Sequence, residues 1–454
     1  MRSPRLHAVG ARVALLLAIL VAAPQAWAVP SFARQTGLAC TACHTIAPQL
    51  NAFGRFFKLH GYVLGPDKLS GGTDQLSIDK FPPLSAMMIV SDSRTNKSQP
   101  DSTVGGAGAQ NGSLAFPQQL SVFYAGAVAE HMGAFTQITY EQAADHFSID
   151  NTDIRYARDA NWGDHSLVWG VTLNNNPTVQ DVWNSTPAWG FPFIASSAAP
   201  GPAAAPFLAG ALAQNVAGLG AYGWLDNSWY GEVTYYRSSQ PGLDQPYDST
   251  ASSVIKGMAP YTRFAWEHAW SGGEGQNDVE LGLIEMSLHQ YPGAGHPLSG
   301  PTDDYRDSGV DAQYQYVTST DSFAAHAEYI HEQQDLNASS AFGISSPSNH
   351  LNYMTLNASY YWDGAYGPTV GYFSTKGSAD PILYTAAPLN GSASGSPDSS
   401  GWIAQWTWLP AMNVQVTAQY TLYDKFNGRS SNYDGSGRNA SDNDTLFVAL
   451  WVLW

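Results

Sequence analysis

From residue 83 onward, apolar and polar residues alternate along the chain with a period of two. Residues 413–422 alternate without a break, and Trp402, Trp406 and Trp408 share one side of another such run. Each run is expected to form a strand with one apolar and one polar face. The alternation predicts sixteen strands, at residues 83–92, 117–129, 133–143, 146–157, 165–174, 217–226, 229–238, 259–270, 278–289, 308–318, 321–332, 350–361, 366–375, 401–409, 411–424 and 444–454.

The connections between these strands alternate in length. Joints of one to seven residues, such as 226–228 and Pro410, take turns with segments of 17 to 42 residues that are rich in Gly, Ser, Pro and Asn. The connection at Ala144-Asp145 is short where this rule asks for a long one. Short turns at one end, long loops at the other and an even number of strands are typical of bacterial outer-membrane barrels.

A soluble β-sandwich is the competing interpretation, because it too is built from short strands. A sandwich would bury its aromatic residues, whereas a membrane barrel displays them near the ends of its strands. The last strand ends on an aromatic residue, Trp454, as closing strands of assembled outer-membrane barrels do. We therefore predict an all-β membrane protein, with a 16-stranded antiparallel outer-membrane β-barrel at residues 81–454. The tryptophans expected to form its interfacial girdle are Trp224, Trp229, Trp266, Trp270, Trp362, Trp402 and Trp408.

The first residues have the features of an export signal. Three arginines precede an apolar run at residues 13–23, and Ala26-Trp27-Ala28 has the form of a cleavage site. We predict a signal peptide at residues 1–28. The apolar run is shorter than the roughly 20 residues that a membrane-spanning helix needs, and no later stretch reaches that length. The mature chain is expected to reach the outer membrane of a Gram-negative cell without a transmembrane helix.

The only two cysteines belong to a C-x-x-C-H run at residues 40–44. This spacing puts both thiols one turn apart, so that they can form thioether bonds to a haem while the histidine ligates the iron. A redox C-x-x-C is expected in a βαβ context, which is absent, and a zinc site needs two further ligands that only histidines could supply. A chance match is the remaining alternative, and the position just beyond an export signal argues against it. We predict a monohaem cytochrome c unit at residues 29–80, with one haem c held covalently by Cys40 and Cys43 and His44 as its proximal ligand.

A short helix is expected at residues 48–59, and Gly61 stands where helices commonly end. Leu50, Phe53 and Phe57 lie near one face of this helix. In so small a unit the haem is most of the core, so these side chains are expected to cover it.

The sixth iron ligand stays open among three candidates, Met87, Met88 and His60. A methionine raises the reduction potential relative to a second histidine. Each candidate has an alternative role. His60 lies at the end of the predicted helix, where a side chain is often simply exposed, and methionine in a strand often only fills space in the core. We favour a methionine.

The chain is acidic, except around the haem motif. Its formal charge is −17, which becomes −20 without the three signal arginines, and this argues against nucleic acid as a partner. Between residues 29 and 66 the only charged residues are Arg34, Arg55 and Lys58. They either cluster by accident or meet haem propionates or an acidic wall.

The strand alternation also predicts which barrel residues face the lumen. Any such assignment would be reversed by a one-residue register error. A barrel of this size leaves an aqueous lumen unless something fills it. We expect the basic N-terminal unit to plug it from the periplasmic side, with its three cations facing a mostly acidic wall. The residues predicted to point inward are Glu232, Arg263, Glu267, Glu280, His326 and Glu328.

The N-terminal unit resembles a known family. The elements F-A-R-Q-T-G at residues 32–37, C-x-x-C-H at 40–44, F-G-R at 53–55 and G-Y at 61–62, followed by a sixteen-stranded barrel, are similar to the outer-membrane monohaem cytochrome–porin fusions known as Fe(II) oxidases of iron-oxidising bacteria. The match covers the first unit closely and the barrel only in size and layout. The resemblance implies an oxidoreductase of the iron:cytochrome c type. Fe(II) would be oxidised at the cell surface and electrons passed to a periplasmic cytochrome c or copper protein.

Two functions from different classes therefore stay open. In the first, the single haem accepts electrons from an extracellular donor, and must be reachable from both sides because no second motif exists to relay electrons across an apolar band of about 25 Å. In the second, the protein is a porin-like transport channel whose haem unit is a structural or gating plug.

One acidic cluster bears weakly on the choice of Fe(II). Acidic residues can attract a divalent cation, but acidic loops are also ordinary in outer-membrane proteins, and we favour this second interpretation. The acidic cluster expected in and beside one long loop is Asp303, Asp304, Asp307 and Asp311.

Overall fold

The computed structural model describes residues 30–64, 83–99, 114–141, 145–239, 254–292 and 300–454. The predicted signal peptide and the predicted boundary between residues 80 and 81 lie outside these ranges. Among the described residues, no helix has both the length and the apolar character needed to cross a membrane.

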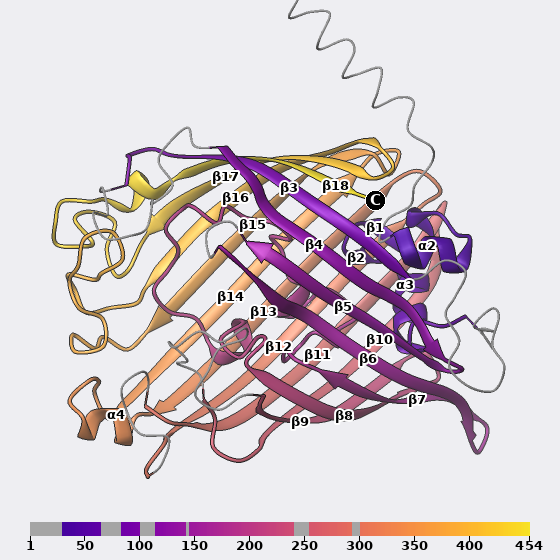
Figure 1. Ribbon diagram of the computed structural model, residues 1–454, viewed down its shortest axis with the longest axis horizontal. Coiled ribbons are helices and arrows are strands. Elements are labelled where there is room, and N and C mark those ends of the chain that lie inside the picture. The colour runs from indigo at the N-terminus through magenta and orange to yellow at the C-terminus, as the bar shows by residue number, and fades with distance from the viewer. Residues whose placement is uncertain (1–29, 65–82, 100–113, 142–144, 240–253, 293–299) are drawn as a thin grey trace, which may run out of the picture.

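Sixteen antiparallel strands close into one barrel (Figure 1). Each strand pairs with its neighbours in chain order, and the last strand closes the barrel on the first, from Thr445 opposite Thr95 to Leu453 opposite Met87. The predicted barrel is confirmed, and the sandwich is excluded. The strands are β3 (Leu84–Thr95), β4 (Leu114–Ala129), β5 (Met132–Glu141), β6 (His146–Trp162), β7 (His165–Asn174), β8 (Val216–Leu225), β9 (Trp229–Ser238), β10 (Ala259–Gly272), β11 (Gly275–Gln290), β12 (Asp303–Val317), β13 (Ser322–Asp335), β14 (Ser348–Tyr361), β15 (Tyr366–Gly377), β16 (Ser399–Ala411), β17 (Val414–Lys425) and β18 (Thr445–Leu453).

Successive side chains alternate between the lumen and the outer surface, as the pleat of a strand requires. In β9, Val233 is 45% exposed while its neighbour Glu232 is 4% exposed. In β11, Leu281 is 54% exposed and Glu280 is fully buried. The outer surface is thus apolar, as a lipid-facing surface is. All six side chains that the sequence predicted to face the lumen are buried: Glu232, Arg263, Glu267, Glu280, His326 and Glu328.

The predicted tryptophan girdle needs one correction. Trp229, Trp362 and Trp402 are exposed on the outside of the barrel, as expected. Trp224 is only 5% exposed, because its position in β8 has the inward parity and packs against Tyr230 and other buried residues. Proximity to a strand end therefore does not by itself place a tryptophan at the membrane interface.

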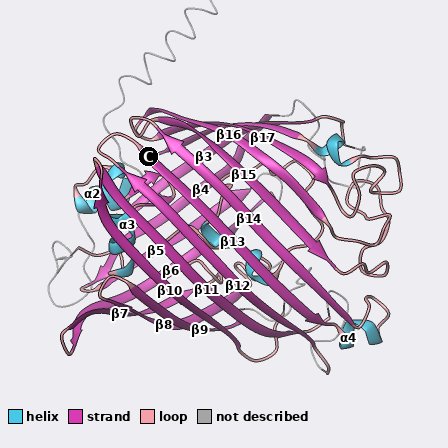
Figure 2. Cartoon of the chain, turned by 180° about the vertical axis from the view of Figure 1, so that it is seen from behind, coloured by secondary structure: helices cyan, strands magenta, loops and turns pink. Residues whose placement is uncertain are grey.

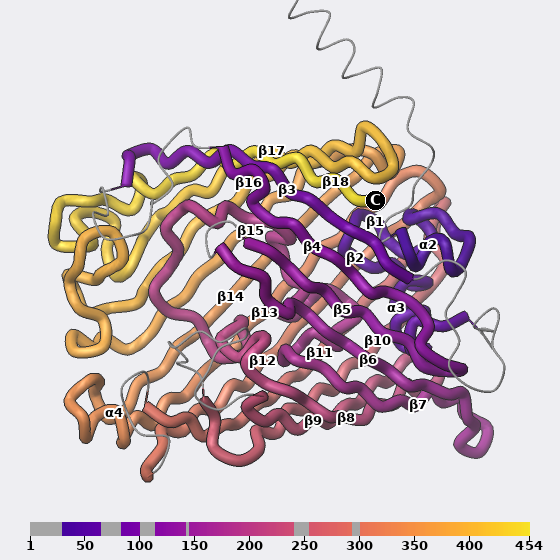
Figure 3. Tube along the Cα trace, in the orientation of Figure 1, coloured from indigo at the N-terminus to yellow at the C-terminus, as the bar shows by residue number. Residues whose placement is uncertain are grey.

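The N-terminal segment, residues 30–64, lies inside one end of the barrel (Figures 1 and 2). The chain trace shows it at the end where the C-terminus lies, which is also the end of the short turns (Figure 3). Phe57 and Tyr62 pack with Met87, Ile89 and Phe123 of the wall in one buried cluster, and Phe32 packs against it. Its elements are α2 (Pro30–Thr36), η1 (Cys40–Ala42), β1 (His44–Ile46), β2 (Gln49–Leu50) and α3 (Ala52–Leu59).

The connection between β7 and β8, residues 175–215, also enters the lumen. It was predicted as an ordinary long loop, yet Val179, Asp181 and Trp183 are almost fully buried. Its only regular elements among the described residues are the short turns η2 (Pro187–Trp189) and η3 (Phe207–Ala209). The first part of this inserted loop contacts the N-terminal segment, where Lys58 donates to Val179 and Asp181. Its later part reaches the long-loop end, where the amide of Ala203 donates to Asn427.

Candidate haem site

The C-x-x-C-H motif forms a single tight turn. The amide of Cys43 donates to the carbonyl of Cys40 at 3.0 Å, which closes η1 and confirms the predicted spacing of one turn between the cysteines. No disulfide joins the two cysteines in the described chain. His44 follows at the start of β1, which pairs with β2 in a short antiparallel hairpin, with His44 opposite Leu50 and Ile46 opposite Gln49.

The helix after the motif is shorter than predicted. It begins at Ala52 and not at Pro48, because Asn51 caps it by accepting the amide of Gly54 at 3.0 Å. Helix α3 ends at Leu59, and Gly61, with φ of +70°, follows its C-cap His60 as predicted. The predicted aromatic face is also corrected, since Phe57 is buried but Phe53 is 37% exposed.

Gly54 fixes the distance between this helix and the motif. A Cβ at this position would overlap the carbonyl oxygen of Cys43. The amide of Asn51 donates to the same carbonyl at 2.9 Å. Helix α3 therefore packs directly on the motif, and only glycine permits so close an approach.

The motif opens onto a cavity of about 370 Å³. Cys40, Cys43 and His44 all line it. The volume falls in the range of small-molecule and cofactor sites, and such sites are lined mainly by apolar side chains with few polar groups. The apolar lining comes from the N-terminal segment, the wall and the inserted loop: Phe32, Leu50, Phe57, Ile89, Phe123, Phe135, Trp189, Trp451 and Leu453.

His44 has the properties of a metal ligand. Burial lowers its pKa to about 4, so that the ring is neutral at pH 7, which is the form that binds iron. Its Nδ1 atom is buried and has no hydrogen-bond partner among the described residues. Burial also raises the pKa of Cys43 to about 11, so its thiol is protonated until it reacts. The two thiols, the neutral imidazole and the apolar walls fit a c-type haem.

The three candidates for the sixth ligand are separated by the fold. Met87 points inward from β3, is 4% exposed and lines the cavity. Met88 has the opposite parity on the same strand and does not line the cavity. His60 lies outside it, where its Nε2 is 3.1 Å from the exposed carboxylate of Asp159. Of the three, only Met87 shares the cavity with His44.

Arg55 anchors the N-terminal segment to the acidic wall, as predicted. Its Nη2 is 2.9 Å from Oε1 of Glu267 and 2.8 Å from Oδ2 of Asp278, and Nη1 donates to Gln315 at 3.2 Å. Burial would lower the pKa of Arg55, but Glu267 and Asp278 raise it above its usual value. Arg55 is therefore a fully buried cation whose partners are two carboxylates and one amide oxygen.

The other two cations were expected to face the same wall and do not. Lys58 donates to the backbone carbonyls of Val179 and Asp181 at 2.7 Å each, and its ammonium lies 4.9 Å from the ring centre of Trp189. Burial, and then the nearby Arg155, lower the pKa of Lys58 to about 7. Arg34 is exposed and donates to the carbonyl of Leu84 at the barrel rim.

A second anchor was missed by the sequence analysis. The hydroxyl of Tyr62 donates to Oδ2 of Asp153 at 2.7 Å, and Nε of Arg155 donates to the same oxygen at 2.7 Å. Burial and the Asp153 carboxylate raise the pKa of Tyr62. Alternation would have predicted that these two residues of β6 point inward, but nothing in the sequence links them to Tyr62.

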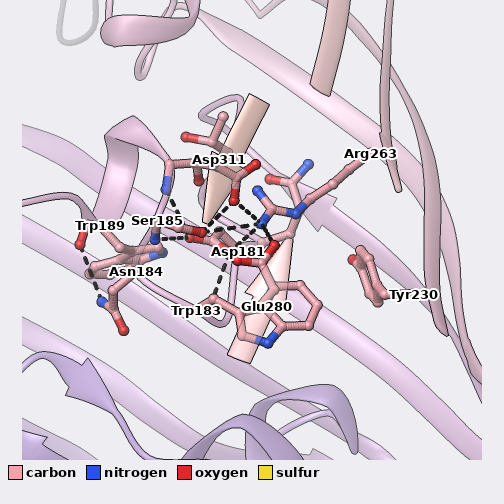
Figure 4. Close-up of polar contacts among 12 residues, drawn as sticks. Asp181, Trp183, Asn184, Ser185, Trp189, Tyr230, Arg263, Glu280 and Asp311 are labelled. Atoms are coloured by element: carbon pink, nitrogen blue, oxygen red, sulfur yellow. Dashed lines mark hydrogen bonds and ion pairs between the residues drawn. The ribbon is translucent and has the colours of Figure 1, made fainter. Parts of the chain in front are cut away.

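The lumen beside the cavity holds a charged network (Figure 4). Nη2 of Arg263 lies 2.7 Å from Asp311, 3.1 Å from Glu280 and 3.3 Å from Asp181 of the inserted loop. Ser185 of that loop donates to Asp311 at 2.5 Å. Burial would raise the pKa of Asp181, but Arg263 and a backbone amide lower it. The network holds the inserted loop against the wall of the lumen.

The prediction that the acidic cluster lies in and beside a long loop is wrong. Its four residues belong to strand β12, where Asp303, Asp307 and Asp311 point into the lumen and are buried. Asp304 points outward, 2.5 Å from His289. No group of three or more acidic, histidine or cysteine side chains in the described chain is arranged to hold a metal ion.

A closed sixteen-stranded barrel with an apolar outside and a charged lumen defines a porin-like outer-membrane barrel. No protein-family model and no curated protein matches this chain. Among solved structures, it is similar to OmpF of Salmonella typhi in complex with daunomycin, with 14% identity over 82% of this chain and 97% of that chain, and a TM-score of 0.46.

Two further structures are similar at the same level. They are the outer-membrane channel DcaP of Acinetobacter baumannii, with 10% identity over 82% of this chain and 96% of that chain (TM-score 0.45), and an anion-selective porin of Comamonas acidovorans, with 11% identity over 82% and 98% (TM-score 0.45). These likenesses describe the barrel and are too distant to assign a function.

Proposed function

We propose that this chain is an outer-membrane electron-transfer protein of the monohaem cytochrome–porin type. It takes electrons from an extracellular donor, foremost Fe(II), and delivers them to a periplasmic cytochrome c or copper protein. The observation that carries the proposal is the cavity at the end of the barrel lumen, which is lined by Cys40, Cys43, His44 and Met87. A haem c bound there would supply a one-electron redox centre.

The residues of the cavity have distinct tasks in this proposal. The thiols of Cys40 and Cys43 hold the cofactor covalently, and His44 ligates its iron. Met87 is the candidate for the sixth position. Phe57, with the other apolar residues of the lining, excludes water from the site.

The position of the cavity supports electron exchange with the periplasm. In barrels of this kind the short turns face the periplasm and the long loops face the outside, so the N-terminal segment enters from the periplasm. On its periplasmic side Thr41, between the two cysteines, is exposed. On the other side Asp181 lines the cavity and pairs with Arg263, and both side chains are buried. In this proposal an electron from the outside would cross this network to reach the haem.

An anaerobic titration of the purified, haem-loaded protein with Fe(II) tests the proposal. We expect the haem absorbance bands to change to those of the reduced state, and mass spectrometry to find one haem attached. The double variant C40S/C43S is the control, since it keeps the barrel but has no covalent haem. Failure of Fe(II) to reduce the haem at every pH at which Fe(II) stays soluble would overturn the iron-oxidising function.

A second candidate is a porin-like transport channel in which the N-terminal segment is a structural or gating plug. The barrel with its charged lumen favours it directly, because a channel needs no redox centre. It predicts ion conductance in planar bilayers that is the same with oxidised and with reduced haem. Conductance of this kind, together with no haem reduction by Fe(II), would select the channel.

A further inference from the structure

The outer side of helix α3 is an exposed aromatic surface. Phe53 is 37% and Phe56 is 38% exposed, and their rings stack at 6.3 Å. The ring of His60 packs on Phe56 with a centroid distance of 3.8 Å. Arg55 and the rest of the opposite side of the helix are buried toward the lumen. The aromatic side chains therefore face away from the lumen, at the mouth of the barrel.

This surface adjoins the turn that carries the two cysteines. The side-chain amide of Asn51, the cap of α3, donates to the carbonyl of Thr41 at 3.1 Å. Thr41 lies between Cys40 and Cys43 and is exposed. This hydrogen bond places Thr41 beside the first turn of α3, and the exposed Thr41, Phe53 and Phe56 are together called here the mouth patch.

Acidic residues of the short turns stand around the mouth patch. Asp159 is 3.1 Å from His60, and its side chain is 82% exposed. Glu130 is exposed and precedes His131, whose carbonyl lies beside Gly61. Asp363 is exposed, and its neighbour Gly364 lies next to the methyl group of Thr41. An aromatic centre with a charged rim is the composition of a protein-binding surface.

We infer that the mouth patch is the docking site for a soluble electron carrier that presents an apolar patch ringed by lysines. This inference rests on the proposed function for the identity of the partner as a redox protein. Its chemistry follows from the rim, where the acidic Glu130, Asp159 and Asp363 outnumber the exposed Arg34 and Arg158, so that the rim attracts a basic surface and steers its approach. The aromatic pair would supply the desolvated contact, and the cysteine turn beneath it places the redox site close to the partner. Interfaces of electron-transfer pairs are small, so a patch of this size suffices.

Binding of a lysine-rich soluble cytochrome c to the haem-loaded barrel in nanodiscs tests the inference without any need for Fe(II). We expect the dissociation constant of the wild type to rise with salt. The variant F53S/F56S should bind roughly tenfold more weakly. The variant E130Q/D159N/D363N should bind more weakly at low salt and lose most of the salt dependence. Asp304→Asn removes an acidic group that faces outward on β12, away from the mouth patch, and should bind like the wild type.

Heat-modifiable migration on gels and the haem spectrum would confirm that each variant is folded. Equal binding by the wild type and both mouth-patch variants would overturn the inference. A change of oligomeric state in F53S/F56S, with carrier binding unaltered, would overturn it as well and would assign the patch to a second copy of the chain. If Fe(II) fails to reduce the haem but the variants still weaken carrier binding, the proposed donor is wrong and the docking site stands.

Discussion

The barrel wall and the N-terminal segment are held together in different ways. In the wall, β12 and β13 pair along their whole length, from Asp304 opposite Asp335 to Val317 opposite Ser322, and every strand has two such partners. In the part of the chain that the structure describes, the N-terminal segment forms no β-ladder with the wall. Side-chain contacts from a few residues hold it, chief among them Arg55, Lys58 and Tyr62.

This difference determines how much each residue matters. A ladder distributes its stability over many backbone hydrogen bonds, each with a net contribution of about 1 kcal/mol. A buried charge concentrates the effect, because its loss leaves partners unpaired. Single substitutions should therefore loosen the N-terminal segment while the wall stays intact. The predictions below test this contrast.

The largest effect is expected from Arg55→Met. It leaves the buried carboxylates of Glu267 and Asp278 without their cation, which costs about 3–5 kcal/mol. Urea titration followed by circular dichroism in the Soret band measures the stability of the segment, and heat-modifiable migration on gels measures the wall. Arg34→Met is the control, because an exposed site is expected to change stability by less than about 0.5 kcal/mol. Equal midpoints for the two variants would contradict the anchoring role of Arg55.

A smaller effect is expected from Gly54→Ala. The new methyl group would overlap the carbonyl of Cys43, so the helix must move from the motif, at a cost of about 1–3 kcal/mol. The same urea titration measures it. Gly231→Ala in β9 is the matched change in the wall, where a Cβ would meet no atom within 4 Å. If both variants unfold at the same urea concentration as the wild type, the close contact between α3 and the motif does not stabilise the segment.

Met87→Leu and Met88→Leu test the two sides of one strand. If Met87 ligates the iron, its loss should lower the midpoint potential by on the order of 100 mV and remove the absorbance band of methionine-ligated haem. Met88→Leu should change neither, because Met88 lies outside the cavity. Unchanged spectra in both variants would leave Met87 as an apolar contact only.

The wall could be predicted from the sequence because its signal is repeated in every strand. A period of two, short turns and long loops give the number of strands, and parity gives the lumen residues. The signal disappears where a strand extends beyond the membrane, since both faces are then polar. This is why the start of β12, with Asp303 inside and Asp304 outside, was predicted as a loop.

The site could be predicted only in part. The spacing of the motif selects Cys40, Cys43 and His44 as candidate haem-binding residues, and all three line one cavity. The choice between Met87 and Met88 depends on a single residue of register in a strand whose two faces are similar in composition. The inserted loop has no periodic pattern, since individual contacts such as Ser185 with Asp311 hold it, and these contacts leave no trace in the sequence.

The smallest effect for one step of the experiment, a change of one pH unit, is expected through Lys58. Its pKa in the folded protein is lowered to about 7, while the unfolded chain titrates near 10.4. Between these values only the unfolded state binds the proton, so the stability of the segment should rise with pH above 7, by at most about 1.4 kcal/mol per unit. Below pH 7 both states are protonated and this slope vanishes. Urea midpoints at pH 7, 8 and 9 measure the slope, which Lys58→Met should abolish and Arg34→Met should keep. If the slope survives in Lys58→Met, a group other than Lys58 titrates between pH 7 and 9. The pH dependence would then not come from a single buried amine of the N-terminal segment.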